Sequence, residues 1–99
     1  MTVSPGEIWL ADRGDETRRL VFVMSDGRFH RYAERAVVAP VLDEVPAVPR
    51  PWHIELSRGR TVAVNQLGTM PLDRLLERTE LADFETLRQA RRAVRSITG

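Results

Sequence analysis

The chain has 99 residues, of which 42% are hydrophobic and 29% are charged. This size and composition predict one compact domain over residues 1–99, because a second hydrophobic core would not fit. The sequence contains no cysteine, which excludes disulfide frameworks, thiolate zinc sites and cysteine nucleophiles. No stretch approaches the roughly 20 apolar residues that span a bilayer, and the first residues lack a signal-peptide pattern, so we expect a soluble, cytoplasmic protein.

All 15 basic residues are arginine, and with 14 acidic residues they leave a formal net charge of +1. This near balance argues against a protein that coats a polyanion, but it allows a local basic patch. The absence of lysine has two interpretations. It reflects codon usage in a GC-rich genome, or it reflects a use for planar guanidinium groups, which suit phosphates and exposed bases better than ammonium groups do.

In the N-terminal half, short apolar runs alternate with polar turns. A first strand is expected over residues 6–11 and a polar loop with a central glycine over residues 12–17. Residues 19–25 form an apolar run that is too short for a helix and suits a strand buried on both faces. A turn follows it, and residues 28–35 are expected to form a helical turn or an irregular connection.

The middle of the chain predicts a further strand, a loop and a hairpin. Residues 36–42 are apolar and include Pro40, which cannot donate to a ladder, so this strand is expected near the border of the sheet. Residues 43–51 hold three of the 6 prolines and are expected to form an extended loop. Residues 52–56 alternate apolar and polar side chains and are expected to pair with residues 61–64.

Helical patterns dominate the last third of the chain. A short helix with proline in its first turn is expected for Pro71, Leu72, Leu75 and Leu76. Asp83 is a good N-cap for an amphipathic helix that ends at Gly99. Its predicted apolar stripe contains Phe84, Leu87, Ala90, Val94 and Ile97, and its other face carries Arg88, Arg91, Arg92 and Arg95. Strands followed by helices predict an α+β fold that is mainly β: a curled antiparallel sheet or partly open barrel with a helix packed on it.

Motifs of the common enzyme classes are absent from the sequence. It has no phosphate-binding Walker loop, no dinucleotide-binding glycine pattern and no nucleophile elbow. Its two histidines, His30 and His53, are too few and too far apart to form a recognisable metal motif. We therefore expect no metal and no cofactor.

Polar residues frame the second predicted strand, with Asp15, Glu16, Arg18 and Arg19 before it and Ser25 and Asp26 after it. In one interpretation they only solvate a loop and the strand ends. In the other, an acid and an arginine on a rigid strand break a phosphodiester without a metal. A guanidinium then neutralises charge on the phosphoryl oxygens, and a second group moves protons on the attacking and leaving oxygens.

The order and spacing of seven short segments resemble the MazF/PemK family of toxins. They are residues 6–11, 14–16, 19–25, 29–31, 37–41, 52–56 and 64–69. The resemblance implies an SH3-like, partly open barrel of the CcdB/PemK/MazF type that forms a homodimer. It also implies an mRNA interferase of a type II toxin-antitoxin system, which cleaves single-stranded RNA without a metal. In that reaction the ribose 2′-OH attacks the adjacent phosphorus and leaves a 2′,3′-cyclic phosphate and a 5′-OH.

The resemblance also assigns roles to individual residues. Arg19 matches the catalytic arginine of the family and Glu16 its loop acid, and Arg18 replaces Arg19 if the alignment slips by one position. Ser25 and Asp26 match a Ser-Asn turn. Candidate RNA contacts are Arg18, Ser25, Asp26, His30, Trp52 and His53, of which Trp52 stacks a base or packs under a loop and His53 has either a structural or an RNA-binding role.

Leu42 departs from the family pattern, because relatives carry at this position a serine or threonine that takes part in catalysis. Leucine neither donates nor accepts a proton, so another group substitutes for the hydroxyl, or the activity is weak, redirected or absent. The candidate substitutes are Thr17, Ser25 and His30, since hydroxyls and a neutral-range imidazole can both exchange protons. The other interpretation of His30 is a loop imidazole beside Phe29.

Two other functions remain open from the sequence. A CcdB-like gyrase poison has the same fold but acts through C-terminal residues that this chain, ending in Arg-Ser-Ile-Thr-Gly, lacks. A catalytically degenerate toxin binds its antitoxin without cleaving RNA, which Leu42 allows. In the leading interpretation, a cognate MazE-like antitoxin supplies an acidic, partly disordered segment that folds as it binds the arginine-lined groove.

Overall fold

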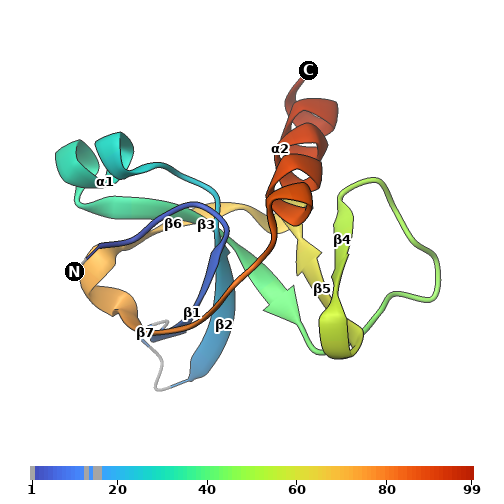
Figure 1. Cartoon of the computed structure of the whole chain (residues 1–99), viewed down its shortest axis with the longest axis horizontal. Coiled ribbons are helices and arrows are strands. Elements are labelled where there is room, and N and C mark those ends of the chain that lie inside the picture. The colour runs from blue at the N-terminus through green and yellow to red at the C-terminus, as the bar shows by residue number, and fades with distance from the viewer. Residues whose placement is uncertain (1, 13, 15–16) are drawn as a thin grey trace.

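The computed structural model describes residues 2–12, 14 and 17–99, and within them one coiled sheet carries two helices (Figure 1). The strands are β1 (Glu7–Asp12), β2 (Arg18–Val23), β3 (Arg35–Leu42), β4 (His53–Leu56), β5 (Arg60–Ala63), β6 (Gly68–Pro71) and β7 (Leu75–Leu81). The helices are α1 (Gly27–Ala33) and α2 (Phe84–Thr98). Short 3-10 turns, η1 (Ser57–Gly59), η2 (Val64–Gln66) and η3 (Leu72–Arg74), join the later strands.

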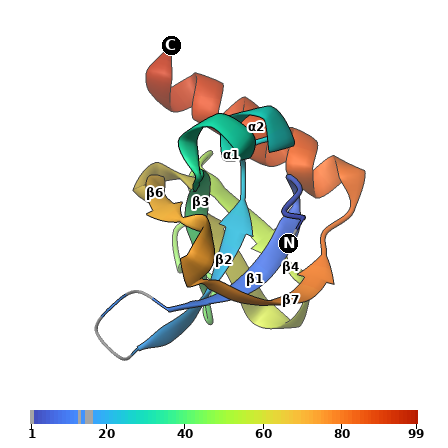
Figure 2. The ribbon, with the colours of Figure 1, turned by 90° about the vertical axis from the view of Figure 1, so that its left-hand side faces the viewer.

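The seven strands form one antiparallel sheet in the order β4-β5-β3-β2-β1-β7, and β6 pairs with β3. Figure 2 shows β1 lying between β2 and β7. The sheet does not close, although an ion pair between Arg60 of β5 and Glu80 of β7 joins two strands that are not neighbours. This arrangement confirms the predicted fold class, a mainly β, partly open barrel with a C-terminal helix.

Alternation along the strands sorts the apolar side chains into two cores. The first core, against which α2 packs, includes Ile8, Phe22, Ala39, Val41, Ile54, Val62, Val64, Ala90 and Ala93. The second core includes Val3, Trp9, Ala11, Val21, Val23, Ala36, Val38 and Leu75. Strand β2 contributes to both cores only through its buried end, because Arg18 and Arg19 are exposed. The prediction that this strand is buried on both faces therefore holds for its second half alone.

The prediction that Pro40 places its strand at the border of the sheet is wrong. Strand β3 pairs with β2 on one side and with β6 and β5 on the other. The backbone carbonyl of Val37 accepts from Met24 N–H at 2.8 Å, so residue 37 turns toward β2 and, by alternation, residue 40 turns away from it. On that far side the pairing with β6 ends at Val38 and the pairing with β5 begins at Val41. The missing N–H of proline thus falls in the gap between two partner strands.

The short helix predicted at residues 71–76 is also wrong. Pro71 ends β6, a single 3-10 turn follows in η3, and Leu75 begins β7. Strand β7 is an edge strand paired with β1, and most of its side chains are exposed and polar. The spacing of the leucines favoured a helix, but pairing with β1, which is distant in the sequence, outweighs the local helix propensity.

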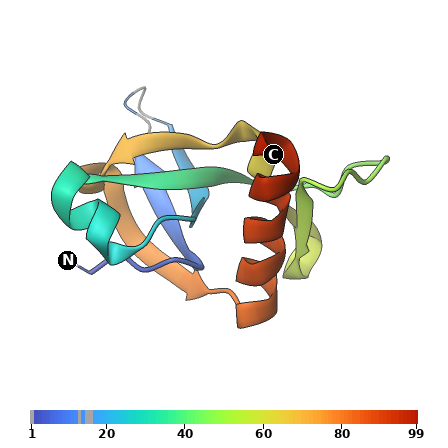
Figure 3. The ribbon, with the colours of Figure 1, turned by 90° about the horizontal axis from the view of Figure 1, so that it is seen from above.

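The remaining elements follow the sequence with one adjustment. Residues 28–35 are largely helical in α1, and β4 pairs with β5 as the predicted hairpin. Asp83 Oδ1 accepts from Thr86 N–H at 2.8 Å and caps α2, which packs beside β4 (Figure 3). Phe84 and Ile97 are exposed, in contrast to the predicted stripe, and Ala93 is buried instead. None of the described helices is long and apolar enough to span a bilayer.

Candidate functional site

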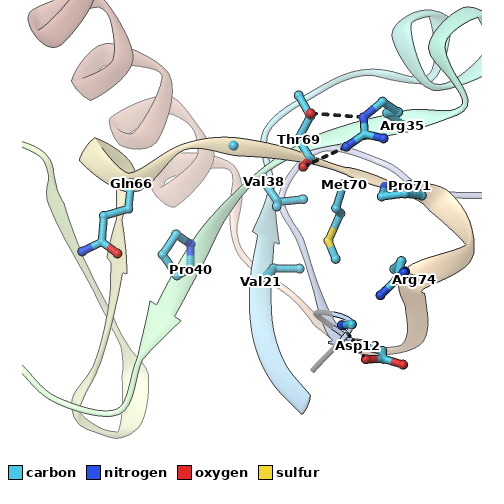
Figure 4. A pocket seen from close by; sticks show the side chains of 12 residues that line it. Asp12, Val21, Arg35, Val38, Pro40, Gln66, Thr69, Met70, Pro71 and Arg74 are labelled. Atoms are coloured by element: carbon cyan, nitrogen blue, oxygen red, sulfur yellow. Dashed lines mark hydrogen bonds between the residues drawn. The ribbon is translucent and has the colours of Figure 1, made fainter. Parts of the chain in front are cut away.

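A groove of about 540 Å³ opens along one face of β2 and β3 (Figure 4). Its apolar surface comes from Val21, Val38, Pro40, Met70 and Pro71, and its polar side chains are those of Asp12, Arg35, Gln66, Thr69 and Arg74. The first group belongs to strands β2, β3 and β6, whose ladders give the groove a rigid wall. The second group places two guanidinium groups and one carboxylate around it.

The register of β2 places its two N-terminal arginines on opposite faces of the strand, and neither of them is among the residues that line the groove. Arg19 pairs with Ala11 of the second core and lies on the same strand face as Val21, which lines the groove. Arg18 shares the opposite face with Phe22 of the first core. Arg19 is exposed and forms no ion pair within the described part of the chain. Its guanidinium is therefore available to an anion at this face.

Two further arginines line the groove, Arg35 held by hydrogen bonds and Arg74 placed beside a glycine. Arg35 Nε donates to Thr69 Oγ1 at 3.1 Å, and its Nη2 donates to the Thr69 carbonyl at 3.2 Å. Arg74 lies against Gly14, whose φ of +87° suits glycine and where a Cβ would collide with the guanidinium. Neither arginine was predicted as a site residue from the sequence, since no motif marks Arg35 at the start of β3, and Arg74 lay in the segment predicted as a helix.

The half-buried Ser25 and the buried His30 belong to a structural network. Val37 N–H donates to Ser25 Oγ at 2.8 Å, and Ser25 Oγ lies 2.7 Å from His30 Nε2. His30 Nδ1 lies 3.0 Å from the carbonyl of Val3, which can only accept. The network therefore assigns the proton to Nδ1, and the Ser25 hydroxyl donates to Nε2. This chain of bonds ties the N-terminal segment, α1 and β3 together, and neither side chain lines the groove.

Substitution of Ser25 by alanine should lower stability without changing the chemistry in the groove. The variant leaves Val37 N–H and His30 Nε2 without their partner, which should cost about 1–3 kcal/mol in the free energy of unfolding. Urea unfolding measures this loss. RNA cleavage per folded molecule should stay within about threefold of the parent, and a larger fall would instead support Ser25 as the substitute for the missing hydroxyl.

Asp26 and Trp52, two of the other predicted RNA contacts, also have structural partners. Asp26 caps α1 by accepting from Phe29 N–H at 3.2 Å and Arg28 N–H at 2.9 Å, and these bonds hold its pKa below the ordinary 3.8. Trp52 is half-buried and packs against the first core, with its ring edge-on to His53. The Nδ1 atom of His53 is buried without a hydrogen-bond partner among the described residues. None of these three residues lines the groove.

The acids of the β1–β2 loop, Asp15 and Glu16, lie outside the described residues. Thr17 is described and exposed directly before β2. Leu42 is the last residue of β3 and lies opposite Thr61, a buried residue whose hydroxyl oxygen has no hydrogen-bond partner among the described residues. This hydroxyl is next to the position where the resemblance expects one, but it is 1% exposed and does not line the groove.

Comparisons with known structures give a consistent result for the fold. The MazE-MazF structure (Form-II) from Deinococcus radiodurans matches with a TM-score of 0.86 and 17% identity, over 100% of this chain and 97% of that one. An endoribonuclease in complex with its cognate antitoxin, from a mycobacterial species, matches with a TM-score of 0.82 and 14% identity, over 99% and 94% of the two chains. An endoribonuclease from a mycobacterial species matches with a TM-score of 0.85 and 13% identity, over 100% and 93%.

A search of curated protein sequences found no match. The sequence model of the PemK-like, MazF-like toxins of type II toxin-antitoxin systems matches residues 4–98, almost the entire chain, and this protein therefore belongs to that toxin family.

Proposed function

We propose that this toxin is a metal-independent endoribonuclease that cleaves single-stranded RNA in the groove along β2 and β3. The observation that carries the proposal is Arg19, an exposed guanidinium without an ion pair within the described residues, on the strand face that lines the groove. Arg35 and Arg74, which unlike Arg19 line the groove, add positive charge there. A phosphodiester is the substrate that such an arrangement suits, because guanidinium groups bind phosphate oxygens in a bidentate manner.

In the proposed reaction, the ribose 2′-OH attacks the adjacent phosphorus, and the P–O5′ bond breaks. The proton of the 2′-OH leaves with a base, the departing 5′-oxygen gains a proton, and the products carry a 2′,3′-cyclic phosphate and a 5′-OH. Arg19 stabilises the negative charge that develops on the phosphoryl oxygens. Glu16 supplies the proton-transfer group by analogy with the family, and no hydroxyl at position 42 assists it, since leucine stands there.

The proposal includes a homodimer and a cognate antitoxin as partner. Two of the similar structures are toxins bound to their antitoxins, which supports such a partner for this chain. An acidic, partly disordered antitoxin segment would compete with RNA for the same guanidinium groups, because carboxylates and phosphates are recognised in the same way. This competition explains how one groove serves both activity and neutralisation.

Purified protein should cut single-stranded RNA into discrete fragments in the presence of EDTA. The expected ends are a 5′-OH, which polynucleotide kinase labels directly, and a 2′,3′-cyclic phosphate, which blocks ligation until it is removed. Products with 5′-phosphates, or activity that EDTA abolishes, would contradict the proposed chemistry. Stabilised gyrase–DNA breaks without RNA cleavage would indicate a gyrase poison, and tight antitoxin binding without either activity would indicate a degenerate toxin.

A further inference from the structure

The guanidinium of Arg35 is half occupied by the protein. A guanidinium has five N–H groups arranged in two forks, one along its Nε edge and one at its end between the two Nη atoms. Thr69 fills the first fork, because its Oγ1 accepts from Nε at 3.1 Å and its carbonyl accepts from Nη2 at 3.2 Å. Within the described part of the chain no acceptor is paired with the second fork.

The two residues are fixed by the sheet from which they project. Strands β3 and β6 pair in a register that joins Arg35 to Pro71 and Val37 to Thr69. Directly before β3, the carbonyl of Glu34 accepts from Leu72 N–H at 3.1 Å. Arg35 and Thr69 both line the groove, where Figure 4 shows the guanidinium beside Thr69. The protein thus holds the Arg35 guanidinium in one orientation, and little side-chain entropy remains to be lost when a ligand binds.

A purely structural role does not explain this arrangement. Both hydrogen bonds of Arg35 are solvent-exposed, and exposed bonds of this kind add little to stability. A preorganised fork with one unused pair of donors is instead what recognition of two adjacent acceptors requires.

We propose that Arg35, positioned by Thr69, is a binding site for a pair of adjacent acceptor atoms on the RNA strand, separate from the cleavage role of Arg19. RNA offers two such pairs: the two non-bridging oxygens of a phosphate, and O6 with N7 of a guanine. The identification of the ligand as RNA rests on the proposed function. The free pair of N–H donors of Arg35 can bind either of these two acceptor pairs.

The test measures binding of uncleavable 2′-O-methyl RNA oligonucleotides by fluorescence anisotropy. Arg35→Lys keeps the charge and removes the fork, and it should weaken binding about tenfold or more. Thr69→Val removes the Oγ1 acceptor and should weaken binding several-fold while position 35 keeps its arginine. Arg92→Lys, on the exposed face of α2, is the matched control and should bind as the parent does. In cleavage assays Arg35→Lys should raise KM and leave kcat nearly unchanged.

The two sources of the acceptor pair give different results. For a phosphate, weakening is equal across sequences, and the salt dependence of binding stays close to that of the parent because lysine keeps the charge. For a guanine, weakening is confined to oligonucleotides with guanine at one position, and 7-deazaguanine there reproduces it. If Arg35→Lys weakens binding of these oligonucleotides but the parent cuts no natural RNA, the proposed function fails and this site stands. If Arg35→Lys and Thr69→Val both bind as tightly as Arg92→Lys, or if the parent binds none of the oligonucleotides, this inference is overturned.

Discussion

Arg19→Ala should slow RNA cleavage by a factor of about 10²–10³, whereas Arg18→Ala should slow it by less than about tenfold. The two residues are adjacent, both exposed and equally charged, and they differ in the face of β2 on which they lie. Only Arg19 shares its face with Val21 of the groove. The comparison therefore separates charge stabilisation at the scissile phosphate from the general attraction of arginines for RNA.

Single-turnover cleavage of a defined RNA oligonucleotide measures both rates. Because neither side chain is buried, both variants should unfold at urea concentrations close to that of the parent, and this is the control for folding. Equal losses in the two variants would mean that these arginines act only by attraction. A larger loss in Arg18→Ala would mean that the alignment is shifted by one residue and that the groove face is not the catalytic face.

Glu7→Ala should lower the free energy of unfolding by about 2–3 kcal/mol. This buried carboxylate accepts from Ser4 N–H at 2.7 Å and Trp9 Nε1–H at 3.1 Å, and it pairs with Arg78 at 3.0 Å. Alanine leaves the buried Trp9 Nε1–H and the half-buried Ser4 N–H without an acceptor, while Arg78 is largely exposed and can return to water. Urea unfolding at pH 7 measures the loss, and Glu77→Ala at an exposed position of β7 should change stability by less than about 0.5 kcal/mol.

The same residue sets part of the acid sensitivity of the fold. Burial by itself raises the pKa of Glu7, but the bonds from Ser4, Arg78 and Trp9 outweigh it and hold the pKa below the ordinary 4.5. The folded state therefore binds fewer protons, so this contribution is present above about pH 4.5 and is lost as the pH falls through the folded pKa.

Unfolding free energies between pH 3 and 7 should accordingly fall less steeply with acid in Glu7→Ala than in the parent. Some slope should remain, because Asp26, Asp83 and Glu85 also have lowered pKa values in the folded chain. An unchanged slope would show that the Glu7 carboxylate titrates alike in the folded and unfolded states.

Local patterns predicted the N-terminal strands from their short apolar runs, and the hairpin and the capped helix from apolar side chains that repeat at the period of the element. They failed at β6 and β7. Strand β7 lies at an edge and buries few side chains, so its apolar residues carry no period of two, and its pairing with β1 joins segments about 70 residues apart. Such a pairing depends on a partner that local sequence does not reveal.

The candidate site likewise contains residues that the sequence predicted and residues that it did not. The choice of Arg19 came from the family resemblance, and the register with β1 places Arg19 and Arg18 on opposite faces of β2. Arg35 and Arg74 could not be predicted, since their approach to the groove depends on the pairing of β3 with β6 and on the course of η3. Ser25 and His30 were predicted for their chemistry, but the fold uses both inside a structural network.

Pro40 limits how far neighbouring strands can extend over the groove. With an N–H at this position, β3 would offer a continuous row of donors from β6 to β5, and either strand could extend along it and cover the groove. Proline lacks this N–H, and its ring places carbon atoms where a neighbouring strand would need a hydrogen-bond donor. At Pro40 the groove is thus bordered by an apolar ring with no backbone donor that would recruit a further strand.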